Sequence, residues 1–384
     1  MPLAALIILE DDRSSSGDMA ALLPITGLTL IEYQAQLARA CGAGHIVVLV
    51  DQLPVELLGA FDRLRSEGVN IDVARDANDA ADRIHPDEQV LLITVGVVAD
   101  QSLLHKLVNQ AEPTIVSVAS NGATGPFERI DGLESWAGLA LLNGKILRDT
   151  VAVLGEWSIG STLMRNALQS GAQRLQVANT DAITLISSSE QARTISARLI
   201  RKAQPSETEA FSRFVTTPFA KYFLTLALNK PLPFELISII PTILSGSALL
   251  LAFLGWLKIS FLMLLLAAFG EAMADIMGSI TARNVKILGF YKTVKLPILM
   301  MMLLITGLSE GAGAYGWTPF VLAMWASSAI WLCLGADHRL LRPTANIAAL
   351  ITGLGLFLGQ PVLGLAALVG YCLAAQIYDR YLHD

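Results

Sequence analysis

Residues Glu271–Arg283 read EAMADIMGSITAR and lie inside a long apolar run, so the carboxylates of Glu271 and Asp275 fall within a segment typical of a membrane helix. The two acids are four residues apart, which places both on one face of a helix. A charged side chain is costly at membrane depth and usually lines an internal, functional cavity. We therefore predict a functional site here. The alternative is that Glu271 lies near a helix end, reaches water and has no function.

The acidic residues divide the 384-residue chain into two parts. Hydrophobic residues make up 53% of the chain, which is high for an ordinary soluble protein. Residues 1–230 hold nearly all the acids, and from Leu236 onward there are six: Glu271, Asp275, Glu310, Asp337, Asp379 and Asp384. This distribution predicts a soluble part followed by a membrane part.

Charge and cysteine content exclude several classes of protein. The net charge of −6, without a basic and aromatic array, predicts no nucleic-acid binding. Cys41, Cys333 and Cys372 are far apart, which fits neither a disulfide framework nor a metal-binding pattern. The N-terminal apolar run follows no basic segment and precedes no small-residue cleavage site. We therefore expect it to be a first strand and not a signal peptide.

Short apolar runs alternate with helical patterns in residues 1–185, which predicts an α/β domain with a mostly parallel sheet. Ligands of such sheets bind beyond the carboxyl ends of the strands. The loop after the first strand is a poor phosphate site, because three acids precede Arg13. The predicted strands are 3–9, 45–50, 69–73, 89–95 and 114–119, and the predicted helices are 30–41, 55–67, 77–84 and 102–110.

Residues 186–232 are predicted to form a linker and a juxtamembrane amphipathic helix. The stretch 209–229 is basic and aromatic, and a helix of this kind next to a membrane segment lies in the interface plane. Its apolar side carries Phe211, Phe214, Phe219, Phe223 and Leu226. Residues 233–384 are predicted to form an all-α domain of six membrane spans. These spans are 236–257, 260–282, 294–309, 317–335, 343–358 and 361–379.

Basic residues predict the orientation of the spans, because they are enriched in cytoplasmic loops. The loops on one side and the tail carry Arg283, Lys286, Lys292, Lys295, Arg339, Arg342 and Arg380, whereas the opposite loops carry Lys258 alone. We expect a multi-pass protein of the inner (cytoplasmic) membrane. Its N-terminal domain, its C-terminus and Arg283 would face the cytoplasm, and Glu310 the other side.

The N-terminal part resembles nucleotidyltransferases of the sugar-nucleotide type. Residues 24–32, PITGLTLIE, match the family's Pro-x-x-Gly-x-x-Leu-x-Glu segment, and residues 136–142, WAGLALL, are similar to a later strand of that fold. The family's glycine-rich loop and its lysine are missing between Arg13 and Pro24. Val95 stands where the resemblance implies a metal-binding Asp. The resemblance implies a nucleotidyltransferase-like domain that has lost nucleotidyl transfer, with a regulatory or docking role as the alternative.

The membrane part resembles the CDP-alcohol phosphotransferase family. The first half of that family's signature is Asp-x-x-Asp-Gly-x-x-Ala-Arg, and residues 275–283, DIMGSITAR, align with it without gaps. The domain order is similar to that of bifunctional inositol-phosphate cytidylyltransferase/phosphotransferases. The resemblance implies transfer of a phosphoryl or phosphatidyl group from a CDP-linked donor to an alcohol, with release of CMP. It also implies a homodimer formed through the membrane domain.

Both halves of this signature are degenerate. In the family, four Asp hold two divalent metal ions, and the last Asp is the base. Here the second Asp is replaced by Gly278 and the signature glycine by Ser279. The last two Asp positions fall at Leu296 and Met300, or at Thr293 and Pro297 if the register is shifted to use Gly289. The residues expected to bind the donor are Asp275, Gly278, Ser279, Ala282, Arg283, Lys292 and Lys295, with Asp275 and Glu271 left as metal ligands. No catalytic residue is assigned.

Three functions follow from these patterns. The first is a pseudoenzyme that binds lipid, a CDP-linked donor or CMP, with Lys292 and Lys295 neutralising phosphate where metals would. The second is an active transferase with a divergent site, which would use Mg²⁺ or Mn²⁺; a pseudoenzyme could hold no metal. The third is a transporter, although the chain lacks an internal repeat. For the two lysines, ordinary anchoring on the cytoplasmic side is the alternative role.

Overall fold

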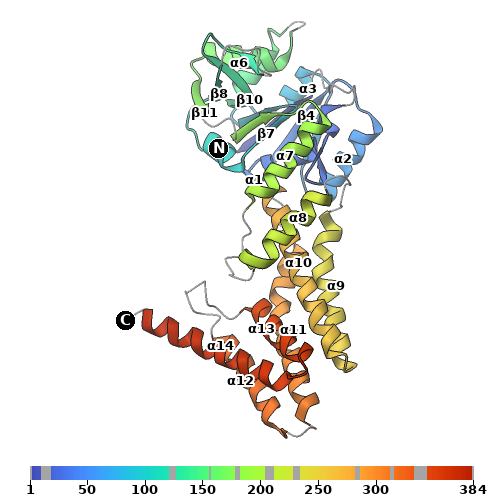
Figure 1. The fold of residues 1–384 in the computed structure, drawn as a ribbon. Coiled ribbons are helices and arrows are strands. Elements are labelled where there is room, and N and C mark those ends of the chain that lie inside the picture. Colours follow the sequence, from blue (N-terminus) through green and yellow to red (C-terminus); the bar gives the residue numbers. More distant parts are fainter. Residues whose placement is uncertain are drawn as a thin grey trace. The chain divides into compact units, whose positions relative to one another are not determined.

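The computed structural model describes residues 2–9, 19–120, 127–154, 157–177, 182–203, 212–227, 234–281, 286–311, 315–332 and 344–382. The chain forms two compact units, one built mainly from residues 1–198 and the other mainly from residues 199–384. The first unit is an α/β domain and the second is helical (Figure 1).

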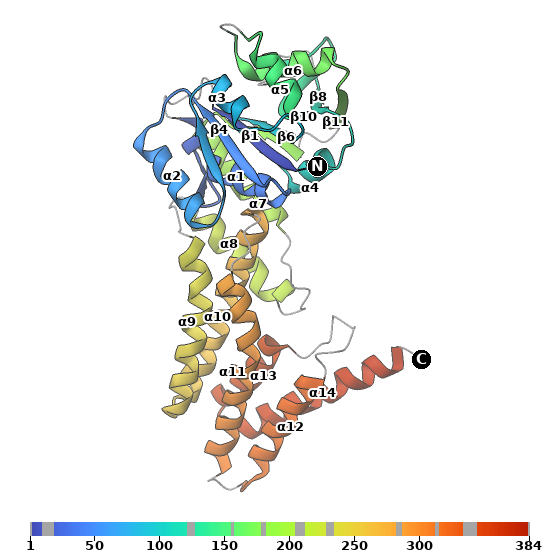
Figure 2. The same ribbon diagram turned by 180° about the vertical axis from the view of Figure 1, so that it is seen from behind.

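The α/β unit contains a mixed sheet in which most neighbouring strands are parallel. The strands of the unit are β1 (Leu3–Leu9), β2 (Pro24–Ile25), β3 (Leu28–Thr29), β4 (His45–Val50), β5 (Ile71–Ala74), β6 (Gln89–Thr94), β7 (Val97–Ala99), β8 (Thr114–Ala119), β9 (Glu128–Arg129), β10 (Glu134–Asn143), β11 (Gln173–Val177) and β12 (Ile183–Leu185). The order in the main sheet is β11-β8-β10-β6-β1-β4-β5, and β9 pairs with β10. β10 runs antiparallel to both β6 and β8. Figure 2 shows β4, β1, β6 and β10 side by side.

Helices cover both faces of this sheet, so its central strands are buried on both sides. The helices of the unit are α1 (Leu30–Ala40), α2 (Val55–Ser66), α3 (Ala77–Asp82), α4 (Gln101–Val108), α5 (Gly144–Val151), α6 (Ile159–Gln169) and α7 (Ser189–Lys202), with the short helix η1 (Ala20–Leu22). Every residue of β1 is buried. Alternate residues such as Leu6 and Ile8 share a core cluster with α3, α5 and α6. The intervening residues point to the opposite face of the sheet.

The expected α/β architecture with a mostly parallel sheet is confirmed. The five predicted strands correspond to β1, β4, β5, β6 and β8, and the four predicted helices to α1–α4. β5 begins at Ile71, two residues later than expected. The strand inferred from WAGLALL is the longer β10, which carries an irregularity between Trp136 and Ala140. Gly138 lies in this irregularity with φ +77°, where a Cβ atom would meet the Thr94 hydroxyl.

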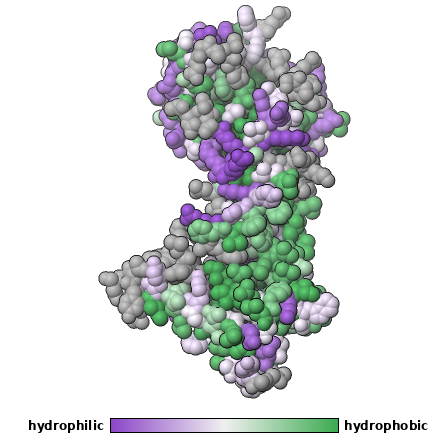
Figure 3. Space-filling view, in the orientation of Figure 1, coloured by the Kyte–Doolittle hydropathy of each residue, from purple (hydrophilic) through white to green (hydrophobic). Residues whose placement is uncertain are grey.

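The described part of the helical unit consists of apolar helices, four of which are long and apolar enough to cross a membrane. Its helices after the junction are α9 (Phe234–Phe253), α10 (Leu257–Thr281), α11 (Lys286–Gly311), α12 (Thr318–Leu332), α13 (Ala345–Phe357) and α14 (Pro361–Leu382). The four long segments are Leu236–Phe253, Leu257–Thr281, Ile287–Glu310 and Pro361–Tyr378, whereas the described parts of α12 and α13 are shorter. The visible surface of this unit is largely hydrophobic, and that of the α/β unit is largely hydrophilic (Figure 3). A multi-pass membrane protein is therefore supported, and a count of six spans stays a prediction.

The third predicted span is longer than the sequence pattern indicated. We expected 294–309, but α11 begins at Lys286 and has 26 residues. The apolar pattern begins late because the first turns of α11 carry Lys286, Lys292 and Lys295, which lower the local hydropathy. All three lysines therefore lie within α11 and not in a loop.

Two helical segments precede α9 in the helical unit. These are η3 (Ser212–Thr216), which has π-helical hydrogen bonding, and α8 (Thr217–Ala227). Phe219, Phe223 and Leu226 of α8 are each more than half exposed. The Phe219 ring also meets the Phe269 ring of α10 edge-on, with centroids 6.1 Å apart. Phe211, the first residue of the expected aromatic side, lies outside the described residues.

Candidate functional site

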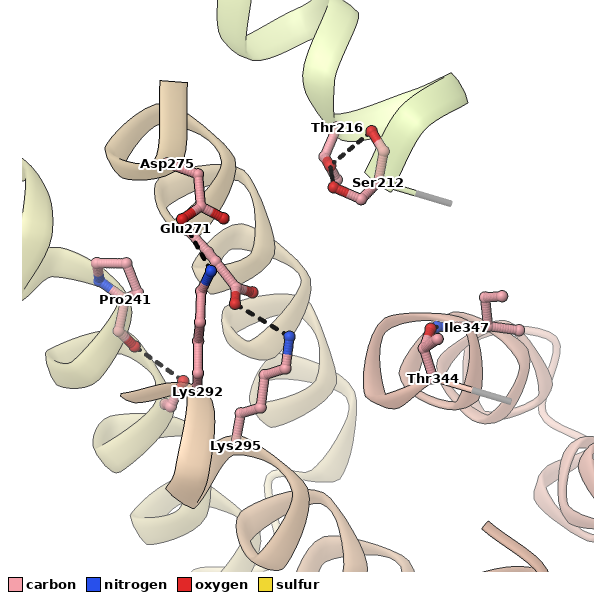
Figure 4. Close-up of polar contacts among 10 residues, drawn as sticks. Ser212, Thr216, Pro241, Glu271, Asp275, Lys292, Lys295, Thr344 and Ile347 are labelled. Carbon is pink, nitrogen blue, oxygen red and sulfur yellow. Dashed lines mark hydrogen bonds and ion pairs between the residues drawn. The ribbon is translucent and has the colours of Figure 1, made fainter. Parts of the chain in front are cut away.

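The acids predicted on one helix face meet two lysines of the next helix. Lys292 Nζ donates a hydrogen bond to Asp275 Oδ1 at 2.9 Å, and Lys295 Nζ donates to Glu271 Oε1 at 3.0 Å. Figure 4 shows both lysine side chains extending from α11 toward the carboxylates of α10. The result is a ladder of two ion pairs inside the helical unit.

The ladder follows from helix geometry and from the direction of the two helices. Glu271 and Asp275 are separated by one helical turn, and so are Lys292 and Lys295. α10 and α11 are joined by a short connection, and the residue numbers of each pair add to nearly the same value, as they must in an antiparallel hairpin. The acid nearer the connection therefore pairs with the lysine nearer the connection. We call Asp275–Lys292 the outer pair and Glu271–Lys295 the inner pair.

The two pairs differ in their exposure to solvent. In the inner pair the side chains of Glu271 and Lys295 are 3% and 11% exposed. In the outer pair Asp275 is 8% exposed, but Lys292 is 29% exposed. Removing one partner of a buried ion pair typically costs about 3–5 kcal/mol, because the remaining charge stays in a medium of low dielectric constant. The inner pair is therefore a strong constraint on how α10 and α11 pack.

The other predicted donor-binding residues of α10 are arranged less favourably for binding. Gly278 is half-buried, and Ser279 is exposed. The Ser279 hydroxyl donates to the Ile276 carbonyl at 2.8 Å, which is a contact within its own helix. Ala282 and Arg283, the last two residues of the signature, lie outside the described residues. The structure thus brings together four of the predicted site residues: Glu271, Asp275, Lys292 and Lys295.

The positions on α11 where the resemblance implies two further Asp residues take part in apolar packing. Leu296 and Met300 are partly buried against the core of the helical unit. This core includes Phe261 of α10 and Leu299 and Met302 of α11. Neither side chain contains an oxygen atom that could bind a metal ion, and both contact hydrophobic neighbours.

The side chains present do not fit the two-metal centre that the resemblance implies. Mg²⁺ and Mn²⁺ prefer oxygen ligands, and a two-metal site clamps both the attacking and the leaving oxygens. Here one oxygen of each α10 carboxylate accepts a hydrogen bond from an ammonium group, so an entering metal ion would face two positive charges. In the described part of the chain, no group of three or more His, Cys, Asp or Glu side chains could hold a metal ion.

The segment of the α/β unit that resembles nucleotidyltransferases has clear structural roles. Residues 24–29 form the β2–β3 hairpin, in which Thr26 and Gly27 have φ values of +47° and +84°. The Thr26 backbone N–H donates to the Ser196 hydroxyl of α7 at 3.1 Å. Glu32 completes a capping box with Thr29 at the start of α1. The loop with Arg13 lies outside the described residues.

The ion-pair ladder is the feature that sequence reasoning missed. The sequence placed the two acids on one helix face and the two lysines nearby, and it left the lysines as phosphate ligands or as membrane anchors. The signal that could have found the pairs is the matched one-turn spacing on two antiparallel neighbours. Recognising this spacing requires knowing where the connection between α10 and α11 ends. The apolar pattern predicted that the third span begins at residue 294, eight residues after the true start of α11 at Lys286, so Lys292 was placed in a loop.

Compared with known proteins, the chain matches no protein-family model and no curated protein sequence.

Proposed function

We propose that this chain is an integral membrane protein similar in plan to CDP-alcohol phosphotransferases, and that it binds a phosphate-bearing ligand at the α10–α11 ladder without transferring the phosphate group. The ligand is an anionic lipid or a CDP-linked donor. The proposal depends mainly on one observation: the ammonium groups of Lys292 and Lys295 on α11 meet the two acids of α10, one of which, Asp275, aligns with the first Asp of the family's signature. An ammonium group is a good point-charge ligand for phosphate.

The same observation supports binding over transfer. Phosphoryl transfer in the family needs metal ions and a base positioned near the acceptor hydroxyl. Residues 276–309 contain no Asp or Glu, so α11 supplies no carboxylate base on the stretch that faces the ladder. Lysines can neutralise a phosphate group, but they provide neither the two-metal geometry nor that base.

The membrane setting makes a lipid ligand accessible to the site. In this proposal α9–α14 form six spans of the inner membrane, with the α/β unit and the C-terminus in the cytoplasm. The exposed Phe219, Tyr222 and Phe223 of α8 support a helix lying in the membrane interface. The ladder is close to the α10–α11 connection, which the basic residues assign to the cytoplasmic side. A lipid headgroup at that level would be near Lys292.

The test is a titration of the purified full-length protein in detergent with CDP-diacylglycerol and, separately, with phosphatidic acid. We expect saturable binding that Lys292→Gln weakens about tenfold, because one charged hydrogen bond is lost. Lys258→Gln is the matched control: it removes the same charge from an exposed lysine in the first turn of α10. Binding of CDP-diacylglycerol alone would identify the nucleotide as the recognised group, and binding of both would identify the lipid phosphate.

Two results would overturn this proposal. The first is that neither ligand binds, or that Lys258→Gln weakens binding as much as Lys292→Gln does. The second is sustained CMP release from CDP-diacylglycerol and an alcohol with Mg²⁺ or Mn²⁺, lost in Asp275→Asn. That second result would establish an active transferase with a divergent site.

A further inference from the structure

The ladder contains a contact that competes with the proposed ligand. Lys292 is the cation that an incoming phosphate group would meet first, because its side chain is the most exposed of the four. Its ammonium group already donates to Asp275 Oδ1 at 2.9 Å. A phosphate group that approaches Lys292 therefore encounters a carboxylate of its own sign within hydrogen-bond distance of the same nitrogen.

We propose that Asp275 is an internal occupant of the phosphate site: it holds Lys292 in the ligand-free protein and releases it when a phosphate-bearing ligand binds. This inference rests on the proposed function. It assigns Asp275 a role opposite to that of a metal ligand, since a metal ligand strengthens the binding of a diphosphate and an internal occupant weakens it. Asp275 is in this sense a positioning residue, which acts on the ligand through Lys292.

The outer pair can exchange partners because Lys292 is partly solvated. An ammonium group on a flexible four-carbon stem can turn from one acceptor to another, and it carries three donors. A charge pair that is partly open to water has a modest interaction free energy, so a phosphate group can displace the carboxylate. The 29% exposure of Lys292 satisfies this requirement.

The inner pair has a different role because it is too buried to exchange. Lys295 is 11% exposed and Glu271 is 3% exposed, so separating them would leave two charges in the protein interior. We therefore assign Glu271–Lys295 to holding α10 and α11 in register, which fixes the position of the outer pair. Glu271→Gln should lower the thermal unfolding midpoint by several degrees. The double variant Glu271→Leu with Lys295→Met should recover most of this loss, because paired hydrophobic replacements of a buried ion pair are tolerated.

The experiment compares the affinity of the full-length protein for CDP-diacylglycerol in detergent among four forms. Asp275→Asn is expected to bind about fivefold more tightly than the wild type, since the competing charge is removed while the side chain keeps its shape. Asp275→Glu restores the carboxylate and should return the affinity toward the wild-type value. Glu310→Gln is the matched control. Glu310 lies on α11 about 27 Å from Lys292, so removing its charge should leave the affinity unchanged.

The outcomes separate this inference from the proposed function. If neither the wild type nor Asp275→Asn binds the probe, the proposed function fails and the internal occupant fails with it. If the wild type binds and Asp275→Asn binds equally or more weakly, only the internal occupant is overturned. Tighter binding in Glu310→Gln equal to that in Asp275→Asn would also overturn it, because the effect would then be one of net charge.

Discussion

The carboxylate of Glu32 shows how a single residue keeps its charge inside the α/β unit. Its side chain is 3% exposed, yet Arg63 Nε donates to it at 2.7 Å, and the Thr29 backbone N–H and hydroxyl also donate to it. Burial alone would raise the pKa of Glu32, but the hydrogen bonds from Arg63 and Thr29 outweigh burial and hold the pKa below its ordinary value of 4.5.

This lowered pKa makes the stability of the α/β unit depend on acid pH. A group whose pKa is lower in the folded state adds stability above its unfolded pKa, and this stability is lost as the pH falls through the folded pKa. We expect Glu32→Gln to destabilise α1 by about 1–2 kcal/mol at pH 7 and to reduce the loss of stability below about pH 4.5. Amide hydrogen exchange of α1, corrected for the intrinsic effect of pH, measures this.

Asp62→Asn is the control for Glu32→Gln. Asp62 forms a 3.6 Å pair with Arg65 on α2, but its side chain is 75% exposed, so solvent screens the interaction. The control should leave the protection of α1 unchanged at both pH values. Equal acid sensitivity in the wild type and in Glu32→Gln would contradict the role assigned to Glu32.

Sequence reasoning at this scale identified the residues of the membrane site but not their contacts. The one-face placement of Glu271 and Asp275 follows from helical periodicity, and both acids do lie on one helix. Their partners depend on the register between two helices, which a pattern within one helix does not contain. For the same reason Leu296 and Met300 were recognised as apolar replacements, but their packing into the core was visible only in the structure.

At the scale of elements, α13 and α14 approach each other closely because both carry glycine at the contact. A Cβ atom at Gly355 would lie 2.6 Å from the Gly364 Cα atom. Small residues at a helix contact allow backbones to approach in a membrane, where association depends on packing. The α13–α14 hairpin is therefore sensitive to a single added methyl group.

We expect Gly355→Ala to destabilise the helical unit by about 1–3 kcal/mol, since the added atom forces the two helices apart. The measurement is the thermal unfolding midpoint of the full-length protein in detergent. Gly370→Ala, on α14, is the matched control, because a Cβ atom there meets nothing within 4 Å. Equal midpoints for the two variants would show that the close approach of Gly355 and Gly364 is not needed.

The elements of residues 3–119 were predicted well from the sequence, except for the two-residue strands β2 and β3 and the three-residue strand β7. The alternation of strands and helices over residues 3–119 identified β1, β4, β6 and β8, because buried strands have continuous apolar runs. The two-residue strands β2 and β3 have too few side chains to show a period. The sequence analysis predicts no elements for residues 144–177, which hold α5, α6 and β11. The antiparallel direction of β10 depends on pairing between strands far apart in the sequence.

At the scale of the whole molecule, the number of spans decides where the segment between α12 and α13 lies. The described part of α12 has 15 residues and α13 has 13, so they measure about 23 Å and 20 Å against a hydrocarbon core of about 30 Å. Residues 333–343, which separate them, lie outside the described residues. If the N-terminal part faces the cytoplasm, as the basic residues predict, this segment would be cytoplasmic with six spans and on the opposite side with four.

We expect six spans, and therefore expect His338→Cys in a cysteine-free protein to be labelled by a membrane-impermeant thiol reagent only after the cytoplasmic side is opened. The reason is that Arg339 and Arg342 favour the cytoplasmic side. Gln360→Cys is the control, because the α13–α14 connection lies on the opposite side in both arrangements. Labelling of both positions in intact cells would instead support four spans.

The ion-pair ladder also bears on how the chain enters the membrane during synthesis. Taken alone, α10 would bring the charges of Glu271 and Asp275 toward the hydrocarbon, and α11 those of Lys292 and Lys295. Each charge costs free energy there, rising to about 2.5–3.5 kcal/mol at the middle of a helix. Inserted together as a hairpin, the helices can match each carboxylate to an ammonium group before either meets lipid. We therefore expect α10 and α11 to insert more readily together than singly, because a chain that ends between them has no lysine partners for its two acids.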